Sequence, residues 1–359
     1  MKYFLIAGEA SGDLHGADVV SEIRGLDKDA QIVGMGGDKM KSAGTKLIVS
    51  YKEYSFMGFV EVLFNLRKIK KLFTIVKQSI LDNKPDRVVL IDYGGFNLKI
   101  AKFCHELSIP THFYILPKTW AWNEKRVLKI KKYVDKGYCI FPFEEEYFKG
   151  HGINASYVGN PVQHQIQEYL SNRKDTTRIE KQIALLPGSR KQEIERITPR
   201  MLEFAKTRKD LSFVLAAHDR EAYGTFTFPH NVRFSDKSTY DIVAESQAAI
   251  VTSGTANLET ALLNTPQVVV YVANSISYAI GKRLVRLKYI SPVNLIMDKL
   301  VIKELIQDDY NIVTLESEVN RLLDTKTSKM MTSNYQELKT ILGNNSAAHE
   351  VAKSITEQK

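Results

Sequence analysis

The chain has 359 residues, 44% of them hydrophobic and 25% charged, and a formal net charge of +9. This composition is ordinary for a soluble globular protein, and the length exceeds what one hydrophobic core usually supports, so we expect two domains. The two cysteines exclude a disulfide framework or a four-cysteine zinc site, no stretch approaches the roughly 18 apolar residues of a membrane span, and the apolar run before Gly8 is too short for a signal peptide.

The first half of the chain alternates apolar runs with stretches of helical spacing, such as residues 15–26. We expect strands at residues 3–7, 31–36, 87–92, 111–116 and 136–141. Strands that alternate with helices are typical of βαβ units around a parallel sheet.

The pattern pauses at residues 163–182, which are charged and only weakly apolar, and then restarts. We expect further strands at residues 183–186, 212–217, 232–235, 248–253 and 268–272. This organisation predicts two Rossmann-like domains, over residues 1–168 and 169–335. A helical pattern from about 334 to 357 has no obvious place in the second sheet, so we assign residues 336–359 to a C-terminal helix that could return to the first domain.

Two loops of the predicted second domain combine small residues with the start of a helix. One ends at Arg190, and the other consists of Ser253, Gly254 and Thr255. Free N–H groups at a helix N-terminus bind anions, and an arginine can clamp a phosphate through two hydrogen bonds. The two loops predict a diphosphate site, with Glu259 placed to accept hydrogen bonds from ribose hydroxyls. The alternatives are a turn with a solvated arginine and simple helix capping by a loop hydroxyl.

Acidic residues follow two predicted strands of the first domain. "GEASGD" (residues 8–13) is dense in small and acidic residues at a strand end, where open parallel sheets bind ligands. Asp92 ends another strand, and partial burial there would raise its pKa and make it a better base. The alternative for Asp92 is a turn residue that caps the next helix. Neither a G-x-G-x-x-G spacing nor a Walker A motif is present, which disfavours NAD and ATP enzymes.

A basic segment indicates an anionic partner. Residues 60–136 carry 16 Lys or Arg against 7 Asp or Glu, an excess equal to that of the whole chain. Within it, an apolar stretch runs directly into basic residues, which suits a helix lying in a membrane interface. The residues assigned to that interface are Phe56, Met57, Phe59, Phe64, Arg67 and Lys68. A buried crossover helix with a basic end is the alternative, and Trp120 and Trp122 are interpreted as core or turn aromatics.

Eight motifs together resemble those of the lipid-A-disaccharide synthase family. They are "GEASGD" (8–13), "MGFVEVL" (57–63), "IDYGGFNL" (91–98), "TWAW" (119–122), "FPFE" (141–144), "LPGSR" (186–190), "SGTANLE" (253–259) and "KELIQDD" (303–309). The resemblance implies an inverting glycosyltransferase of the GT-B type, an α/β fold of two Rossmann-like domains facing a central cleft. It implies transfer of 2,3-diacylglucosamine from UDP to 2,3-diacylglucosamine 1-phosphate (lipid X), which gives the β-1,6-linked disaccharide phosphate and UDP. The nucleotide would bind the second domain and the acceptor the first, with no cofactor and no metal.

The resemblance also implies roles for single residues. Asp92 is placed as the base, Glu9 and Ser11 face the acceptor or the transferred sugar, and Asn294 is assigned to substrate or nucleotide binding. Asp13 has the alternative role of capping the following helix. Three departures from the family pattern are Gly94-Gly95 in place of Pro-Asp, Leu116 in place of a serine, and a shifted Pro292.

The expected partners are UDP-diacylglucosamine, lipid X and an anionic membrane surface, and no nucleic acid. We expect a cytoplasmic protein attached peripherally to the inner membrane, with a homodimer as one option for its oligomeric state. One alternative is another GT-B enzyme, either an epimerase or a different lipid-linked glycosyltransferase. The other is a non-catalytic UDP-sugar-binding protein associated with membranes, which would bind UDP without releasing it from a donor.

Overall fold

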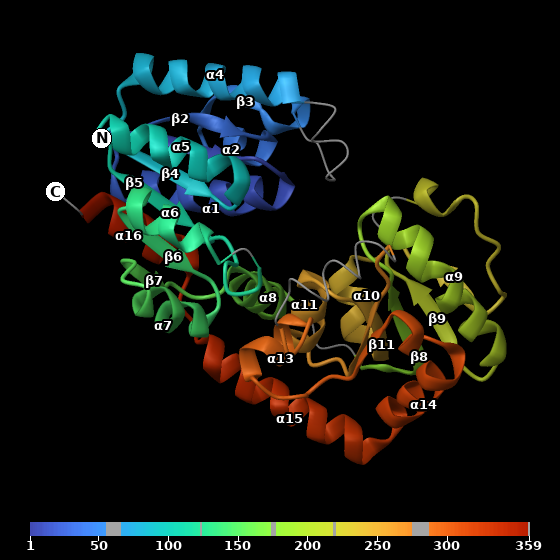
Figure 1. Cartoon of the computed structure of the whole chain (residues 1–359). Coiled ribbons are helices and arrows are strands. Elements are labelled where there is room, and N and C mark those ends of the chain that lie inside the picture. The colour runs from blue at the N-terminus through green and yellow to red at the C-terminus, as the bar shows by residue number, and fades with distance from the viewer. Residues whose placement is uncertain (55–65, 123, 174–176, 218–219, 275–286, 358–359) are drawn as a thin grey trace. The chain divides into compact units, whose positions relative to one another are not determined.

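The structure is a computed structural model that describes the chain apart from residues 55–65, 123, 174–176, 218–219, 275–286 and 358–359. Its contacts divide the chain into two compact units. Unit 1 comprises Met1–Pro161 and Asn344–Lys359, and unit 2 comprises Val162–Gly343. Each unit is built on one parallel sheet flanked by helices (Figure 1).

Seven described strands form the sheet of unit 1, in the order β3-β2-β1-β4-β5-β6-β7. They are β1 (Lys2–Ala7), β2 (Gln31–Gly36), β3 (Lys46–Ser50), β4 (Arg87–Ile91), β5 (Thr111–Tyr114), β6 (Lys136–Cys139) and β7 (Ala155–Tyr157). The five strands predicted here are confirmed, and the shorter or less apolar β3 and β7 add the two edges. The strand order reverses between β1 and β4, which makes their carboxyl ends the topological switch point where such sheets bind ligands.

Alternate residues of the central strands face two separate apolar layers. Phe4 and Ile6 pack with the helices of residues 66–83, 94–106 and 126–133, whereas Tyr3 and Leu5 pack with those of residues 10–26 and 347–357. Burial on both faces explains why β1 is an unbroken apolar run and not an alternating pattern. The helices of this unit are α1 (Ala10–Leu26), α2 (Asp38–Ser42), α4 (Leu66–Asn83), α5 (Gly94–Glu106), α6 (Arg126–Tyr133), α7 (Pro142–Gly150) and α16 (Ala347–Glu357), with a 3-10 turn at Tyr51–Glu53.

The C-terminal helical pattern is two helices separated at Gly343. Gly343 has a φ of 66°, a conformation that favours glycine and ends α15 (Thr325–Leu342). The following helix, α16, buries Val351 and Ile355 against the layer that contains α1. A hydrogen bond of 2.8 Å between His349 Nδ1 and Glu22 Oε2 also connects it to α1. The last helix of the chain therefore completes the core of unit 1.

Six described strands form the sheet of unit 2, in the order β10-β9-β8-β11-β12-β13. They are β8 (Ile179–Leu186), β9 (Ser212–Leu215), β10 (Val232–Phe234), β11 (Ser246–Thr252), β12 (Gln267–Tyr271) and β13 (Glu304–Ile306). The order reverses between β8 and β11, so their carboxyl ends form the switch point of this sheet. The helices are α8 (Pro161–Asn172), α9 (Lys191–Thr207), α10 (Thr239–Glu245), α11 (Thr255–Leu262), α13 (Pro292–Met297), α14 (Ile312–Leu323) and α15, with 3-10 turns at Glu221–Tyr223 and Gln307–Asp309.

Candidate functional site

Glu9 and Asp92 meet at the switch point of unit 1. The register of β1 and β4 pairs Ala7 with Ile91, so the loops that carry the two carboxylates start from neighbouring positions. Burial and the negative charge of Glu9 raise the pKa of Asp92 to about 6, although the positive charge of Lys118 opposes the shift. An aspartate with that pKa is still largely ionised at neutral pH and is a stronger base than an ordinary one. Sequence reasoning missed Lys118, because it follows a different strand.

The backbone at Asp92 adopts an unusual conformation. Asp92 and Tyr93 have φ angles of 47° and 50°, in the left-handed region that non-glycine residues rarely occupy. Asn97 stabilises the turn, because its Nδ2 donates to the carbonyl of Asp92 at 2.7 Å and to that of Ile91 at 3.2 Å. Strained residues of this kind cluster at functional sites, where the surrounding structure maintains them.

The first residues of "GEASGD" support this turn. A Cβ atom on Gly8 would lie 2.2 Å from the ring of Tyr93, so only glycine allows the ring to pack there. Ser11 Oγ donates to Glu9 Oε1 at 3.2 Å, which brings a third predicted residue into the same group. Gly8 therefore leaves room for the residue that follows Asp92, and Ser11 forms a hydrogen bond with Glu9.

Asp13 has a structural role different from the one expected. It is buried within the first turn of α1, and its carboxylate accepts hydrogen bonds from the backbone of Gly37 (2.6 Å), Met40 (3.1 Å) and Lys39 (3.2 Å). These N–H groups belong to the start of α2, so Asp13 caps α2 and not the helix that directly follows it. The sequence alone could not predict this contact, because it depends on the tertiary structure, in which the start of α2 lies beside the start of α1.

The motifs "TWAW" and "FPFE" contact each other in unit 1. Trp120 Nε1 donates to Glu144 Oε1 at 2.9 Å, and the same buried carboxylate accepts from the backbone N–H groups of Phe141 (3.0 Å) and Ile140 (3.2 Å). Trp122 is exposed, with the guanidinium of Arg126 4.6 Å from its ring centre. Trp120 is thus a structural aromatic, as expected.

In unit 2, Arg190 lies at the start of α9, immediately after the turn that follows β8. Gly188 has a φ of 116°, which favours glycine, and a Cβ there would lie 2.5 Å from the Glu193 carboxylate. The Arg190 side chain is 65% exposed, and its Nη1 is 3.7 Å from Glu193 Oε1. An ion pair that is this exposed contributes little to stability, so the guanidinium is free to rotate toward a phosphate group.

The residues of the loop after β11 differ in how available they are to a ligand. Gly254, with a φ of 150°, is the N-cap of α11, and the exposed Thr255 is its first residue. Ser253 Oγ is already used, since it donates to the carbonyl of Ile290 at 2.9 Å. Glu259 is half-buried, which raises its pKa, while a hydrogen bond of 3.2 Å from the Tyr240 hydroxyl acts against that shift.

Asn294 is buried and its amide has its hydrogen bonds satisfied within the protein. Its Nδ2 donates to Ile302 O (2.8 Å) and Glu304 Oε1 (2.9 Å), and its Oδ1 accepts from the N–H groups of Val301 (2.9 Å) and Ile302 (3.0 Å). Glu304 also accepts from the backbone of Ile290, whose carbonyl binds Ser253. Asn294 and Glu304 therefore connect β13 to the loop after β11, although the sequence assigned no individual role to Glu304 within the motif "KELIQDD". No donor or acceptor of the Asn294 amide is left for a substrate.

Only some of the residues predicted to contact a membrane lie in the part of the chain that the structure describes. Phe56, Met57, Phe59 and Phe64 lie outside the described residues, whereas Arg67 and Lys68 are exposed at the start of α4. Farther along, α4 buries Leu72, Val76 and Ile80 in the core. Within the described chain, no helix is long and apolar enough to cross a bilayer, and no cluster of His, Cys, Asp or Glu could hold a metal ion.

Comparison with known proteins decides the family. Residues 3–358 match the family model described as lipid-A-disaccharide synthetase. The chain belongs to the lipid-A-disaccharide synthase family. It is 34% identical over 340 residues to the synthase of Geobacter metallireducens, covering 90% of this chain and 88% of that one. It is also 34% identical over 378 residues to that of Myxococcus xanthus, covering 99% and 97%. The expected family is confirmed, and with it a glycosyltransferase that forms the lipid A disaccharide.

Solved structures confirm the GT-B type of fold. A UDP-GlcNAc 2-epimerase from Neisseria meningitidis, solved with UDP-GlcNAc, aligns with a TM-score of 0.69 at 13% identity, over 100% of both chains. The glycosyltransferase of kitacinnamycin aligns with a TM-score of 0.67 at 12% identity, over 99% of this chain and 98% of that one. At these identities the likeness concerns the fold alone.

The departures from the synthase motifs have local structural explanations. Gly94 begins α5, and a Cβ there would lie 2.8 Å from the ring of Pro117. Leu116 is buried in the core. Pro292 is the first residue of α13, a position that proline favours, and Ser291 caps that helix by accepting from the N–H of Asn294 at 3.2 Å. The shifted proline therefore begins a regular helix.

Proposed function

We propose that this synthase transfers 2,3-diacylglucosamine from UDP to the primary hydroxyl of 2,3-diacylglucosamine 1-phosphate. The acceptor oxygen attacks the anomeric carbon of the donor, the bond from that carbon to the UDP oxygen breaks, and the configuration inverts to the β-1,6 linkage. The proton of the acceptor hydroxyl passes to Asp92. The observation that carries the proposal is the pKa of about 6 at Asp92, which lies beside Glu9 at a switch point.

The proposal divides the work between the two units. In unit 1, Asp92 acts as the base, and Glu9 and Ser11 face the sugar. In unit 2, Arg190 and the helix start at Gly254 and Thr255 bind the diphosphate, where positive charge and free N–H groups favour the leaving UDP. Glu259 accepts from the ribose hydroxyls. Asn294 acts indirectly in this scheme, by positioning the segment that binds Ser253.

The proposal is tested with UDP-2,3-diacylglucosamine and lipid X as substrates. Mass spectrometry should find the disaccharide phosphate together with one UDP for each product, and neither should form when the acceptor is omitted. A water-soluble, unacylated product would favour a different GT-B enzyme, and UDP binding without UDP release would favour a non-catalytic protein.

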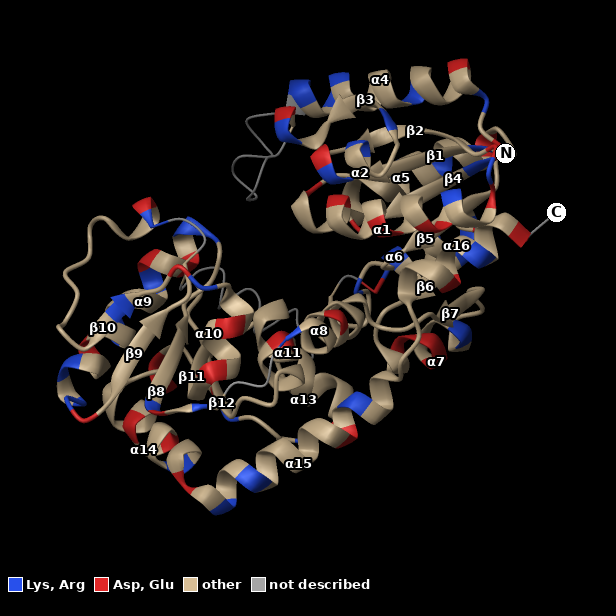
Figure 2. Ribbon diagram, turned by 180° about the vertical axis from the view of Figure 1, so that it is seen from behind, with Lys and Arg blue, Asp and Glu red and all other residues tan. Residues whose placement is uncertain are grey.

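We also propose that the protein associates peripherally with the cytoplasmic face of the inner membrane. Lys and Arg recur along α4 (Figure 2), starting with the exposed Arg67 and Lys68. Cations near a bilayer surface favour anionic lipids, by about 1 kcal/mol for each residue. The protein should therefore sediment with phosphatidylglycerol vesicles more than with phosphatidylcholine vesicles, and equal sedimentation would contradict the proposal.

A further inference from the structure

Helices α4, α5 and α6 of unit 1 line an open pocket of about 660 Å³ that the sequence did not predict. Its volume lies within the roughly 300–1,000 Å³ of small-molecule sites. Six cations line it: Lys77, Lys99, Lys102, Lys125, Arg126 and Lys129. Glu106 is the single acidic residue among the lining residues, so the pocket has a strong positive charge.

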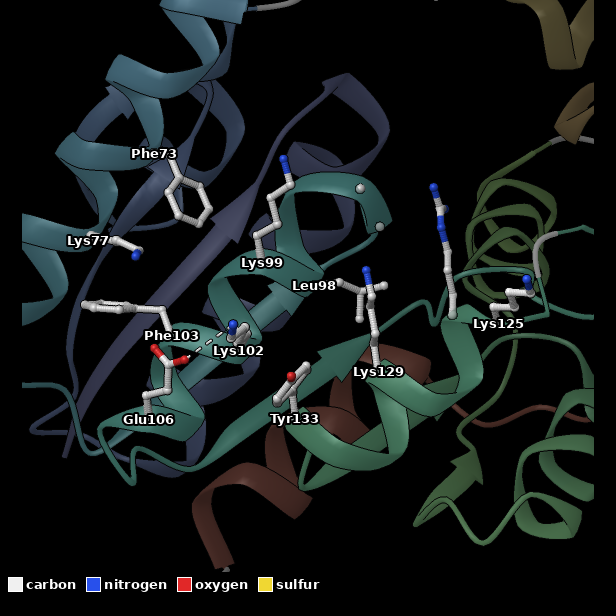
Figure 3. Close-up of a pocket in the computed structure, with 13 residues that line it drawn as sticks. Phe73, Lys77, Leu98, Lys99, Lys102, Phe103, Glu106, Lys125, Lys129 and Tyr133 are labelled. Carbon is white, nitrogen blue, oxygen red and sulfur yellow. Dashed lines mark ion pairs between the residues drawn. The ribbon is translucent and has the colours of Figure 1, made fainter.

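The cations are not equally available to a ligand. Lys102 is 3.7 Å from Glu106, and Lys77 lies over the rings of Phe103 (4.4 Å) and Phe73 (4.9 Å). No ion pair within the described chain involves Lys99 or Lys129. Both are exposed, and Figure 3 shows their ammonium groups extending in the same direction, from α5 and α6. Two unpaired ammonium groups on facing helices suit a dianion such as a phosphate monoester.

Apolar side chains and the start of α5 complete the lining of the pocket. Phe73, Leu98 and Phe103 contribute its apolar lining, beside the cations (Figure 3). Gly94 and Gly95, the first residues of α5, also line it and follow Asp92 closely in the chain. The lining therefore suits a ligand that combines an anionic group with apolar chains, and the Gly94 end of the pocket adjoins the turn that carries Asp92.

We propose that this pocket binds the phosphate monoester of the acylated acceptor sugar. Lys99 and Lys129 contact the phosphate, and Phe73 and Phe103 contact an acyl chain. The identity of the acceptor rests on the proposed function, whereas the preference for an acylated phosphate monoester rests on the pocket itself. Binding the phosphate here positions the sugar so that its hydroxyl can approach Asp92.

The test compares two acceptors, lipid X and the same diacylated sugar without its phosphate. The wild-type protein should prefer lipid X in kcat/KM, and the double variant Lys99→Gln/Lys129→Gln should lose roughly 10- to 100-fold of that preference, as expected for one or two lost charge-assisted hydrogen bonds. Its kcat/KM for the dephosphorylated acceptor should remain at the wild-type level. The matched control is Lys131→Gln/Lys132→Gln, which removes two exposed charges from α6 outside the pocket and should keep the preference.

A binding measurement separates failure of this inference from failure of the proposed function. By calorimetry, wild-type protein and control should bind monomeric dihexanoyl phosphatidic acid, and the pocket variant should bind it at least tenfold more weakly. If no disaccharide forms from either acceptor, the proposed function fails, and this calorimetric difference alone still supports the pocket. An unchanged acceptor preference in a folded pocket variant overturns the inference. An unchanged preference with weaker binding to phosphatidylglycerol vesicles also overturns it, and would assign these lysines to the bilayer surface.

Discussion

At the scale of single residues, Asp92 is distinguished by three features. It occupies a left-handed backbone conformation, its pKa is raised to about 6, and it lies beside a second carboxylate, Glu9. A turn residue that only caps a helix needs none of these features. Together they favour the role of base over the structural alternative for this residue.

Replacing Asp92 by asparagine should remove basicity and keep the shape of the side chain. We expect kcat to fall by about 10²–10⁴-fold, the usual contribution of a positioned base. UDP affinity and the melting temperature should stay at wild-type values, because the proposed donor-binding residues lie in unit 2. Turnover close to wild type would remove Asp92 as the base and direct attention to Glu9.

The pH dependence of turnover should report the interaction between the two carboxylates. The reactive form of Asp92 is ionised, so kcat/KM should fall as the pH drops below about 6. The charge of Glu9 raises the pKa of Asp92, so Glu9→Gln should lower this pKa and move the acidic limb of the profile to lower pH. Asp38→Asn, which removes an exposed carboxylate at the start of α2, should leave the limb in place. An unmoved limb in Glu9→Gln would mean that another group titrates.

Arg190 should contribute to UDP binding through its guanidinium. Arg190→Ala should weaken UDP binding by about 1.5–3 kcal/mol, as expected for a lost charge-assisted contact to phosphate. Lys206→Ala removes an exposed charge from the opposite end of α9 and serves as the control. Calorimetry that finds the same UDP affinity in Arg190→Ala and in the control would remove Arg190 from the site.

At the scale of elements, the functional candidates lie where a central strand ends and a helix begins. β1, β4, β8 and β11 each run into such a turn, and they are the two central pairs of the two sheets. The turns are rigid for different reasons. Asn97 fixes the turn after β4, and the chain of contacts from Ser253 through Ile290 to Glu304 fixes the one after β11. Such fixed turns orient side chains before a substrate binds.

Asp13 should stabilise α2 and not take part in chemistry. Asp13→Ala leaves the buried N–H groups of Gly37 and Met40 without an acceptor, which should lower the free energy of unfolding by about 1–3 kcal/mol in urea. Asp38→Ala removes an exposed carboxylate from the same helix and should lower it much less. A stable Asp13→Ala variant with reduced turnover would instead assign Asp13 to the acceptor site.

At the scale of the whole molecule, the chain passes from unit 1 to unit 2 and back again. The return places Ala347, Val351, Ala352 and Ile355 in the layer that also contains the apolar face of α1. Two contacts reinforce it, from His349 to Glu22 and from the Tyr138 hydroxyl to Ser354 Oγ at 3.0 Å. Unit 1 is therefore incomplete without the last helix of the chain.

Weakening α16 should destabilise unit 1 and leave nucleotide binding intact. Ile355→Ala removes a fully buried side chain, which should cost about 2–5 kcal/mol of the free energy of unfolding. Below the melting transition, UDP affinity should be unchanged, because the predicted nucleotide residues lie in unit 2. The control is Lys353→Ala on the exposed face of α16. Equal stability of the two variants, measured by urea unfolding, would show that α16 contributes little to the core.

The amino-acid sequence by itself determined the two parallel sheets, the turns that carry candidate residues, and the family. Apolar runs are local signals, so the central strands could be predicted without knowing their neighbours. Motif order likewise identifies the family without any structure. The strands that were not predicted, β3, β7 and β13, lie at sheet edges, where little apolar surface is buried and the local signal is correspondingly weak.

Only the tertiary structure decided which of these residues meet. Glu9 raises the pKa of Asp92 because β1 and β4 are neighbours across the reversal of strand order, a pairing that no local pattern encodes. Asn294 has its hydrogen bonds satisfied because β13 brings Glu304 to it. The basic pocket exists because three helices, each amphipathic by itself, pack on one face of a sheet. The physical reason is common to all three cases: burial is encoded residue by residue, but contacts between distant segments depend on how strands pair and how helices cross over the sheet.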